Sequence, residues 1–324
     1  MTMLVLCDHD RGTLADASLE ALTFGRDLAA AAGVSCEAVV IGKGAEGAAG
    51  QLAAYGAAVV HLASHDVLTD FGPEAWGETL AQLVASSGAS VVTACGTDRG
   101  NEVLAQVAAR LDEPFVANCR EVDPSGDTWS LTRVQWGGSL LEDATLTADR
   151  KIVSVAHHVV EAAPAPEPAA GTVAAFSPDL DASLARTVVT DRVVLSRGIT
   201  LSTAPVVVGG GRGVGSAEAF APLEELAAEL GGVVGCSRAV TNNGWRPHSD
   251  QVGQTGTRIA PQVYIASGIS GAIQHWVGAM ASKHILAINT DREANIVTRA
   301  DWAVIADLHK VIPAITEEIR RRRG

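Results

Sequence analysis

The sequence has few of the residues that mark several common protein classes. Only 4% of its residues are aromatic, too few for an aromatic-rich β sandwich, and no apolar run reaches membrane-spanning length. Basic residues are also scarce, since 24 Lys and Arg stand against 37 Asp and Glu and the formal net charge is -13. Because nucleic-acid binding requires clustered cations, this charge argues against a nucleic-acid partner.

Cysteine is equally uninformative as a site residue. The five cysteines are an odd number without C-x-x-C spacing, so neither a disulfide framework nor a zinc site is indicated. Four of them lie in apolar, strand-like surroundings and are expected to be small core residues in a reducing compartment. The opening MTMLVLCDHD lacks the basic start of a signal peptide. We therefore expect a cytoplasmic protein without membrane insertion. The cysteines are Cys7, Cys36, Cys95, Cys119 and Cys236.

Ala, Val and Gly are abundant, and they occur in alternating strand-like and helix-like segments. This alternation predicts an α/β fold with a mostly parallel sheet and helices on both faces. From 115 to 156 several strands separated by turns interrupt the pattern. The predicted strands begin with MTMLVLCD and continue at 35–41, 58–63 and 89–94, and the predicted helices span 15–32, 46–55, 73–86 and 101–111.

Length and composition predict two domains, because 324 residues are many for a single core. Residues 161–171, EAAPAPEPAAG, continue neither a helix nor a strand, and we interpret them as a semi-rigid linker. A strand-like stretch at 187–195, TVVTDRVVL, cannot be assigned to either domain. We expect an N-terminal α/β domain at 1–190 and a C-terminal domain at 203–324, each with a doubly wound, mostly parallel sheet.

The second domain opens with APVVVGGGRGVGSAEAFAPLEELAAEL, a buried strand that leads through a glycine-rich turn to a helix. Such a turn can place backbone N–H groups against phosphate. The dinucleotide fingerprint fails because Val214 or Ser216 stands where its last glycine belongs, and the P-loop fails because Ser216 stands where it needs lysine. A tight turn and a phosphate site both stay open. Arg212 favours a ligand, since it holds a permanent positive charge in the turn.

Two further loops carry polar groups without an evident structural need. Ser237 and Arg238 follow directly after a buried strand, where ligands of open α/β sheets bind. The segment QVGQTGTRIAP then offers Gln251, Gln254 and Thr255 between glycines. Each loop alone fits a polar surface crossing, but three such loops at successive strand ends favour a shared ligand.

The segment GISGAIQH begins a helix without a charged residue. Gly268 and Gly271 are predicted to let a bulky ligand approach the backbone, and Ser270 to cap the helix. The helix end would then supply a positive field by itself. Gln274 and His275 lie about one turn into the helix, in reach of the same ligand. The alternative for His275 is a hydrogen-bonded core histidine, which the residue type alone favours.

No metal site is predicted. Asp8 and Asp10 flank His9 in a stretch that we expect to be a solvated loop. His157 and His158 are adjacent, and in a strand they would point to opposite faces, which argues against joint ligation. No Ser, His and Asp set for nucleophilic catalysis can be assembled either.

Several motifs of the second half resemble one family. GGGRGVGS, CSRAV and QVGQTG, followed by YIASGISGAIQHWVGAMASKHILAINTDREANIV, resemble in sequence and order the C-terminal domain of the electron-transfer flavoprotein alpha subunit. MLVLCDHDRGTLADASLEALTFGRDLA and CGTDRGNEVLAQVAARLDEPFVANC resemble its first domain. The likeness spans nearly the whole chain, is highly specific at 204–315 and is looser from about 120 to 200.

This resemblance implies a Rossmann-like FAD-binding domain with the cofactor among these loops. Thr255 would lie close to N5 of the flavin, and His275 would meet its O2 edge. Asn289 and Asp307 would lie at the adenosine end. Arg238 and the nearby helix end would favour a singly reduced, anionic flavin. The residues implied in FAD binding are Arg212, Ser237, Arg238, Gln251, Gln254, Thr255, Gly256, Gly268, Ser270, Gly271, Ala272, Gln274, His275, Asn289 and Asp307.

The resemblance also implies partners. The family works as a heterodimer with a beta subunit, which in many members carries AMP. The first domain has no phosphate-binding glycine motif and fits a docking scaffold better than a second nucleotide site. The implied function is an electron carrier rather than an enzyme. It would accept electrons from flavin dehydrogenases, such as the acyl-CoA dehydrogenases of fatty acid β-oxidation, and pass them to a quinone oxidoreductase or another acceptor.

Two other functions stay open at this point. One is a subunit of an NADH-oxidising, electron-bifurcating complex with a second FAD in the beta subunit. The other is an adenine-nucleotide-binding regulator with a degenerate flavin site. Asn242, Thr257 and Ser267 depart from the Asp, Lys and Val or Cys usual in the family, and these departures imply a flavin potential different from that of a typical member.

Overall fold

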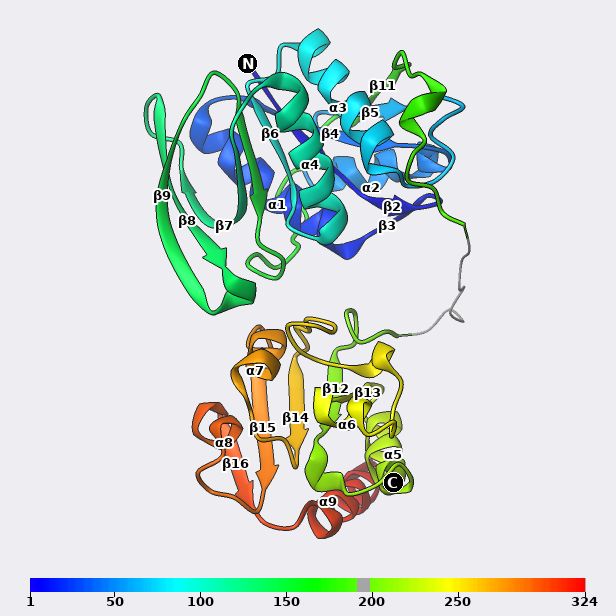
Figure 1. Ribbon diagram of the computed structural model, residues 1–324, viewed down its shortest axis with the longest axis vertical. Coiled ribbons are helices and arrows are strands. Elements are labelled where there is room, and N and C mark those ends of the chain that lie inside the picture. The colour runs from blue at the N-terminus through cyan, green and yellow to red at the C-terminus, as the bar shows by residue number, and fades with distance from the viewer. Residues whose placement is uncertain (191–198, 324) are drawn as a thin grey trace. The chain divides into compact units, whose positions relative to one another are not determined.

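The computed structural model describes residues 1–190 and 199–323 and divides into two compact units, Met1–Val193 and Val194–Gly324 (Figure 1). Each unit has a parallel-rich sheet with helices on both faces, so the predicted fold class is confirmed. Of the strand-like stretch at 187–195, residues 187–190 form no strand and the rest lies outside the described residues. No helix in the described ranges is long and apolar enough to span a membrane.

The first unit is built on a nine-stranded sheet in the order β11-β5-β4-β1-β6-β10-β7-β8-β9. The strands from β11 to β7 run parallel, and β8 and β9 extend the sheet antiparallel. A two-stranded ribbon lies beside it. The strands are β1 (Thr2–Leu6), β2 (His9–Asp10), β3 (Thr13–Leu14), β4 (Ser35–Ile41), β5 (Val59–Ala63), β6 (Val91–Cys95), β7 (Phe115–Asp123), β8 (Thr128–Gln135), β9 (Leu140–Thr147), β10 (Lys151–Val155) and β11 (Thr172–Phe176).

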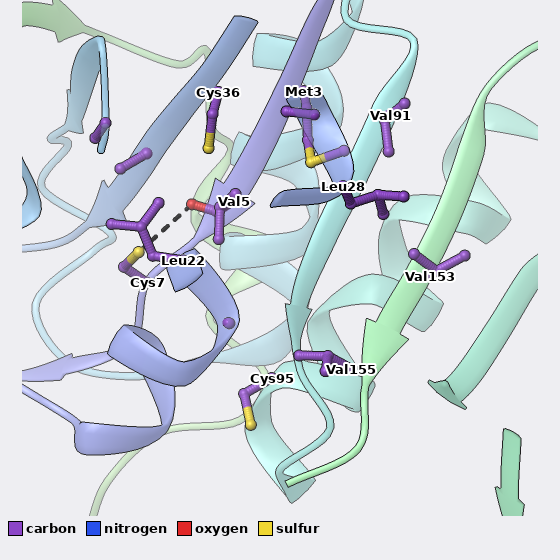
Figure 2. Close-up of a cluster of buried hydrophobic side chains, with 14 of the residues drawn as sticks. Met3, Val5, Cys7, Leu22, Leu28, Cys36, Val91, Cys95, Val153 and Val155 are labelled. Carbon is purple, nitrogen blue, oxygen red and sulfur yellow. Dashed lines mark hydrogen bonds between the residues drawn. The ribbon is translucent and has the colours of Figure 1, made fainter. Parts of the chain in front are cut away.

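Helices α1 (Asp16–Ala32) and α2 (Ala49–Ala54) cover one face of this sheet, and α3 (Pro73–Ser87) and α4 (Asp98–Leu111) cover the other. Figure 2 shows the core on the α1 side, where Met3 and Val5 of β1 meet Leu22 and Leu28 of the helix. These side chains are at most 5% exposed. Because both faces are covered, the central strands β1, β6 and β10 are buried on both sides rather than at alternate positions.

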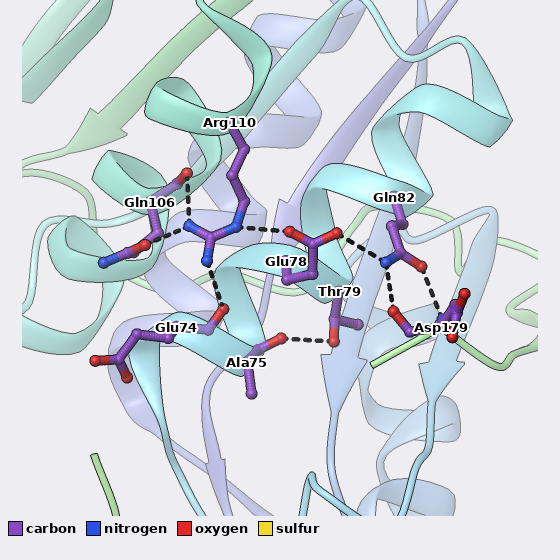
Figure 3. Close-up of polar contacts among 8 residues, drawn as sticks. All are labelled: Glu74, Ala75, Glu78, Thr79, Gln82, Gln106, Arg110 and Asp179. Carbon is purple, nitrogen blue, oxygen red and sulfur yellow. Dashed lines mark hydrogen bonds and ion pairs between the residues drawn. The ribbon is translucent and has the colours of Figure 1, made fainter. Parts of the chain in front are cut away.

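A group of polar side-chain contacts joins α3 to α4 and to the chain beyond β11 (Figure 3). Arg110 of α4 donates from Nε to Glu78 of α3 at 2.7 Å and from a terminal nitrogen to the Glu74 carbonyl at 3.2 Å. Gln82 of α3 exchanges two hydrogen bonds with the backbone of Asp179, at 2.8 and 2.9 Å. Half-buried charge-assisted bonds of this kind fix orientation as well as adding stability.

The Pro- and Ala-rich tract at 161–171 lies inside the first unit, so its interpretation as a linker is wrong. The amides of Ala165 and Ala169 donate to carbonyls of α2 at 2.8 and 3.0 Å, and the tract then delivers β11 to the edge of the sheet beside β5. Composition showed that neither a helix nor a strand continues here, but a tract without regular structure can still bond its backbone to neighbouring elements.

Two histidine segments differ from expectation. His9 is buried rather than solvated, and both its ring nitrogens bond backbone: Nδ1 accepts from Gly12 and Nε2 contacts the Ile41 carbonyl. His157 and His158 lie beyond the end of β10, in a turn where His158 takes a left-handed φ of 64°. Strand alternation does not apply there, and the two rings stack with centroids 3.6 Å apart. The expectation that they point to opposite faces is wrong.

The second unit has a five-stranded, all-parallel sheet in the order β13-β12-β14-β15-β16. Helices α5 and α9 pack on one face, and α7 and α8 on the other. Its elements are β12 (Val206–Gly210), α5 (Ala221–Glu229), β13 (Val233–Cys236), α6 (Arg238–Asn242), β14 (Val263–Ser267), α7 (Ile273–Ala279), β15 (His284–Asn289), α8 (Asn295–Arg299), β16 (Trp302–Ile305) and α9 (Leu308–Arg323).

Candidate functional site

The loops that follow the five strands of the second unit share one edge of the sheet, because all the strands run parallel. The chain leaves β12 toward β13 on one side, whereas β14 leads on to β15 on the other. Ligands of open parallel sheets bind at such a switch point, outside the carboxyl ends of the strands. The sequence-predicted site residues from Arg212 to Asp307 lie in or beside the loops at this edge.

The loops after β12 and β14 approach each other at backbone distance. Gly211 donates its N–H to Ser267 at 2.8 Å, and Gly213 donates to Gly268 at 3.1 Å. A Cβ atom on Gly211 would lie 2.2 Å from the Gly268 carbonyl oxygen. The glycine-rich turn is therefore required for loop-to-loop packing at the switch point, whatever it binds.

The space beside each glycine of the β14 loop is occupied by protein atoms and is not open to a ligand. Gly268 and Gly271 have φ values of 62° and 76°, and a Cβ on Gly271 would lie 2.3 Å from the Ile296 nitrogen. Their interpretation as openings for a bulky ligand is wrong. Ser270 is also not the helix cap: α7 begins at Ile273 after Ala272, because the left-handed Gly271 turns the chain before the helix starts. The Ser270 side chain stays exposed.

The segment from Gln251 to Thr257 packs against α7. Gln254 donates its backbone N–H to the Gln274 carbonyl at 2.7 Å, and a Cβ on Gly278 would lie 2.3 Å from the nitrogen of Gly253. This contact brings the exposed side chains of Gln254, Thr255 and Gln274 to one place. Two segments that are some twenty residues apart in sequence thus form one polar surface.

Gln251 lies beneath this surface and is only 2% exposed. Its side-chain oxygen accepts from the Thr241 hydroxyl at 2.8 Å, and its nitrogen donates to the Thr255 hydroxyl oxygen at 2.9 Å. Buried amides need such partners. Gln251 thereby orients Thr255 and ties its loop to α6.

His275 lies in the core, as in the alternative that treats it as a hydrogen-bonded core histidine. It is 6% exposed, and its Nε2 lies 2.8 Å from the hydroxyl of Tyr264, a fully buried residue of β14. Burial lowers the pKa of His275 to about 4, because the desolvated imidazolium is disfavoured. The ring is therefore neutral at physiological pH and lies at the base of the loop cluster.

Two exposed arginines stand at the ends of neighbouring strands. Arg212 follows β12 in a short 3-10 turn, and Arg238 opens α6 after β13. The Ser237 amide donates to the Gly210 carbonyl at 3.0 Å, which holds the second strand end against the first. Because guanidinium groups carry a permanent charge, the two arginines give this part of the edge a positive field.

Asn289 and Asp307 both serve local structure. Asn289 donates to the Ile269 carbonyl at 2.9 Å and accepts from Asp291 at 3.0 Å, so it braces the β14 loop. Asp307 accepts from the His309 amide at 2.9 Å and caps α9. Asp307 is exposed and Asn289 half-buried, so both also border the edge.

Sequence reasoning missed three supporting residues: Thr241, Tyr264 and Arg246. Thr241 and Tyr264 lie on other elements and hydrogen-bond to Gln251 and His275. No local sequence pattern predicts such contacts. Arg246 pairs with Asp250 at 2.7 Å and with Glu224 at 2.5 Å and so anchors the loop before Gln251. Only its four-residue spacing from Asp250 could have indicated this pair.

Comparison with known proteins decides the family. A family model described as the electron transfer flavoprotein domain matches residues 3–181, and one described as the electron transfer flavoprotein FAD-binding domain matches residues 200–280. A relative from Mycobacterium tuberculosis, "Electron transfer flavoprotein subunit alpha", is 38% identical over 99% of both chains. The chain belongs to the electron transfer flavoprotein alpha-subunit family.

Other members of the family differ in the names they carry. "Electron transfer flavoprotein subunit alpha" of Thermoanaerobacterium thermosaccharolyticum is 34% identical over 98% of this chain and 97% of its own length. "Protein FixB" of Bradyrhizobium diazoefficiens is 34% identical over 98% of this chain and 88% of its own length. The predicted resemblance is confirmed, and with it an electron-transfer role, since the family is one of electron carriers.

The residues of the loop edge fit FAD. The cofactor is anionic at its pyrophosphate and carries hydrogen-bond acceptors on its ring. The edge exposes two guanidinium groups, amide donors on Gln254 and Gln274 and a hydroxyl on Thr255. The FAD-binding match covers all of these residues.

Substituting Gly211 with Ala tests the close loop approach. The added methyl cannot fit beside the Gly268 carbonyl, so unfolding of the second unit should become easier by about 1–3 kcal/mol, as for other overpacked sites. Thermal unfolding followed by circular dichroism measures this change.

The matched control is Gly50→Ala in α2, where a Cβ atom meets nothing within 4 Å. That change should leave stability unaltered or raise it by about 0.4–1 kcal/mol. Equal unfolding midpoints for Gly211→Ala and the unsubstituted protein would contradict the packing.

The neutrality of His275 predicts a pH dependence. Its folded pKa of about 4 lies below the ordinary 6.5, so the unfolded chain takes up a proton first as the pH falls. Stability should therefore decline between about pH 6.5 and pH 4. His275→Gln should flatten this part of the profile of unfolding midpoint against pH, while His284→Gln, at an exposed position, should not. A profile unchanged by His275→Gln would show that the ring is not held neutral.

Proposed function

We propose that this chain binds FAD in the loops at the carboxyl edge of the second sheet and serves, with a beta subunit, as an electron carrier. It accepts electrons from a flavin dehydrogenase, such as an acyl-CoA dehydrogenase of fatty acid β-oxidation, and passes them to a quinone oxidoreductase or another acceptor. The observation that carries the proposal is that exposed arginine, amide and hydroxyl groups all lie in or beside the loops at the carboxyl edge of the second sheet.

The flavin supplies the electron chemistry, and the chain supplies binding, orientation and charge. Arg238 and Arg212 favour added negative charge on the cofactor. Thr255 is held by the buried Gln251 and would offer its hydroxyl to the flavin ring as a hydrogen-bonding group. Ser270 and Ala272 offer exposed groups before α7 to the phosphate region, and the buried Gly271 between them sets the turn that presents them, with Gly256 and Ser237 at the borders of this region. His275 contributes a neutral ring at the base of the site.

The first unit is proposed as the scaffold that docks the beta subunit, in which AMP or a second FAD is expected. Its β8–β9 hairpin supports this role, since Trp136, Leu140 and Leu141 are 77%, 50% and 59% exposed there. Contiguous exposed apolar groups mark interaction surfaces. The five buried, free cysteines support a reducing, cytoplasmic setting.

The absorption spectrum of the chain co-expressed with its beta subunit tests the function directly. The expected result is a flavin spectrum that passes through a singly reduced, anionic form during stepwise dithionite reduction. Reduction by a dehydrogenase but not by NADH supports the carrier; reduction by NADH would instead establish the bifurcating complex. A folded, colourless heterodimer that binds AMP and rejects FAD would overturn flavin binding and favour a nucleotide-binding regulator.

Replacing Arg238 with Ala tests the charge that we assign to the site. Loss of a fixed cation beside the reduced ring should lower the flavin potential by tens of millivolts, on the order expected for one charge near a surface, and less singly reduced flavin should accumulate. Spectroelectrochemical titration measures both.

Arg299→Ala is the matched control, because it removes the same charge from the end of α8, where Arg299 stacks on Trp276. Its potential should equal that of the unsubstituted protein. An Arg238→Ala titration identical to the control would refute the assignment of Arg238.

A further inference from the structure

A buried carboxylate in the first unit faces two stacked histidines. Glu20 lies on α1 and is 9% exposed, while His157 and His158 lie in the turn after β10. Oε1 of Glu20 is 3.1 Å from Nδ1 of His158 and 3.8 Å from Nε2 of His157. The group brings together one carboxylate and two imidazoles from segments more than 130 residues apart in sequence.

Contacts with both histidines hold the Glu20 carboxylate in place. The backbone N–H of His158 donates to Oε2 at 2.8 Å, so the carboxylate is fixed with Oε1 directed at both rings. A buried carboxylate of this kind attracts a cation.

One ring nitrogen of His158 lacks a partner in the part of the chain that the structure describes. Nε2 of His158 is buried and has no hydrogen-bond partner among the described residues. The residue holds a left-handed φ of 64°, an uncommon conformation for a side chain of this size. The two rings stack with centroids 3.6 Å apart, and imidazole nitrogen is a common ligand of transition metals.

We propose that Glu20, His157 and His158 bind a divalent transition-metal ion of the Zn²⁺ class. Each residue offers one ligand atom, and these atoms all lie within 4.8 Å of one another. Ligands about 2.0–2.2 Å from a tetrahedral ion lie roughly 3.3 Å apart, and the distances of 3.1 and 3.8 Å bracket that spacing.

The ligand set selects the metal class. Two imidazoles and one carboxylate suit zinc and its first-row neighbours, whereas calcium and magnesium prefer oxygen ligands alone. Three protein ligands leave a fourth position for water. The ion enters from the side of His157, whose side chain is 21% exposed against 9% for His158. Once bound, it links α1 to the turn that precedes the 161–171 tract, independently of any flavin.

The test uses the full chain co-purified with its beta subunit and stripped with EDTA. Zn²⁺ is titrated in competition with a chromophoric chelator, and Co²⁺ serves as a spectroscopic probe through its visible d–d absorption. We expect one equivalent bound per alpha chain. His157→Gln and His158→Gln should each weaken binding by at least about tenfold, since even an outer-shell change alters metal affinity by about 10–100-fold.

His61→Gln is the matched control. His61 contacts the Glu37 carboxylate at 2.7 Å, a histidine–carboxylate pair in the same unit that is absent from the three-residue cluster, and its loss should leave Zn²⁺ affinity unchanged. Zn²⁺ should also raise the thermal midpoint of the unsubstituted protein and of His61→Gln, but not that of His157→Gln. Equal Zn²⁺ binding by the unsubstituted protein and His157→Gln, or no binding by either, would overturn the site and leave a purely structural ion pair.

Discussion

The candidate flavin site depends on one constraint, the close approach of two backbones at the centre of the second sheet. The turn after β12 and the turn after β14 are joined by the bonds from Gly211 and Gly213, and a side chain at Gly211 would separate them. With these turns joined, Arg212 after β12 and Arg238 after β13 lie at the same edge of the sheet. The polar surface is therefore a result of backbone packing. Glycines inside the packed turns determine where the solvent-facing side chains lie.

The sequence was sufficient to predict strands and helices because their signals are local. The run from Ser35 to Ile41 is a strand with those bounds, and the helix predicted at 15–32 begins one residue later. The loop cluster was also predictable, since parallel strands bring their carboxyl ends together. The sequence could not show which polar side chains hydrogen-bond within the protein rather than face solvent. Gln251 and His275 have the same sequence context as the exposed residues of these loops, yet both form hydrogen bonds in the interior.

Expectations failed where a local rule was applied beyond its range. Alternation in a strand placed His157 and His158 on opposite faces, but the strand ends at Val155 and the turn stacks their rings. The capping rule placed a helix start at Ser270, but the left-handed Gly271 delays it. In both cases one residue adopts a positive φ, which the hydrophobic periodicity of the sequence does not reveal, and the local rule then gives the wrong structure.

The position of β11 bears on how the first unit reaches its native state. The strand follows β10, near the middle of the sheet, yet it pairs with β5 at the far edge, joining residues that are more than 110 apart in the chain. Contacts of such sequence separation carry a large loop-closure entropy and form after local ones. We therefore expect β11 to join the sheet late in folding, and until then β5 is an open edge on which a nascent chain can pair wrongly.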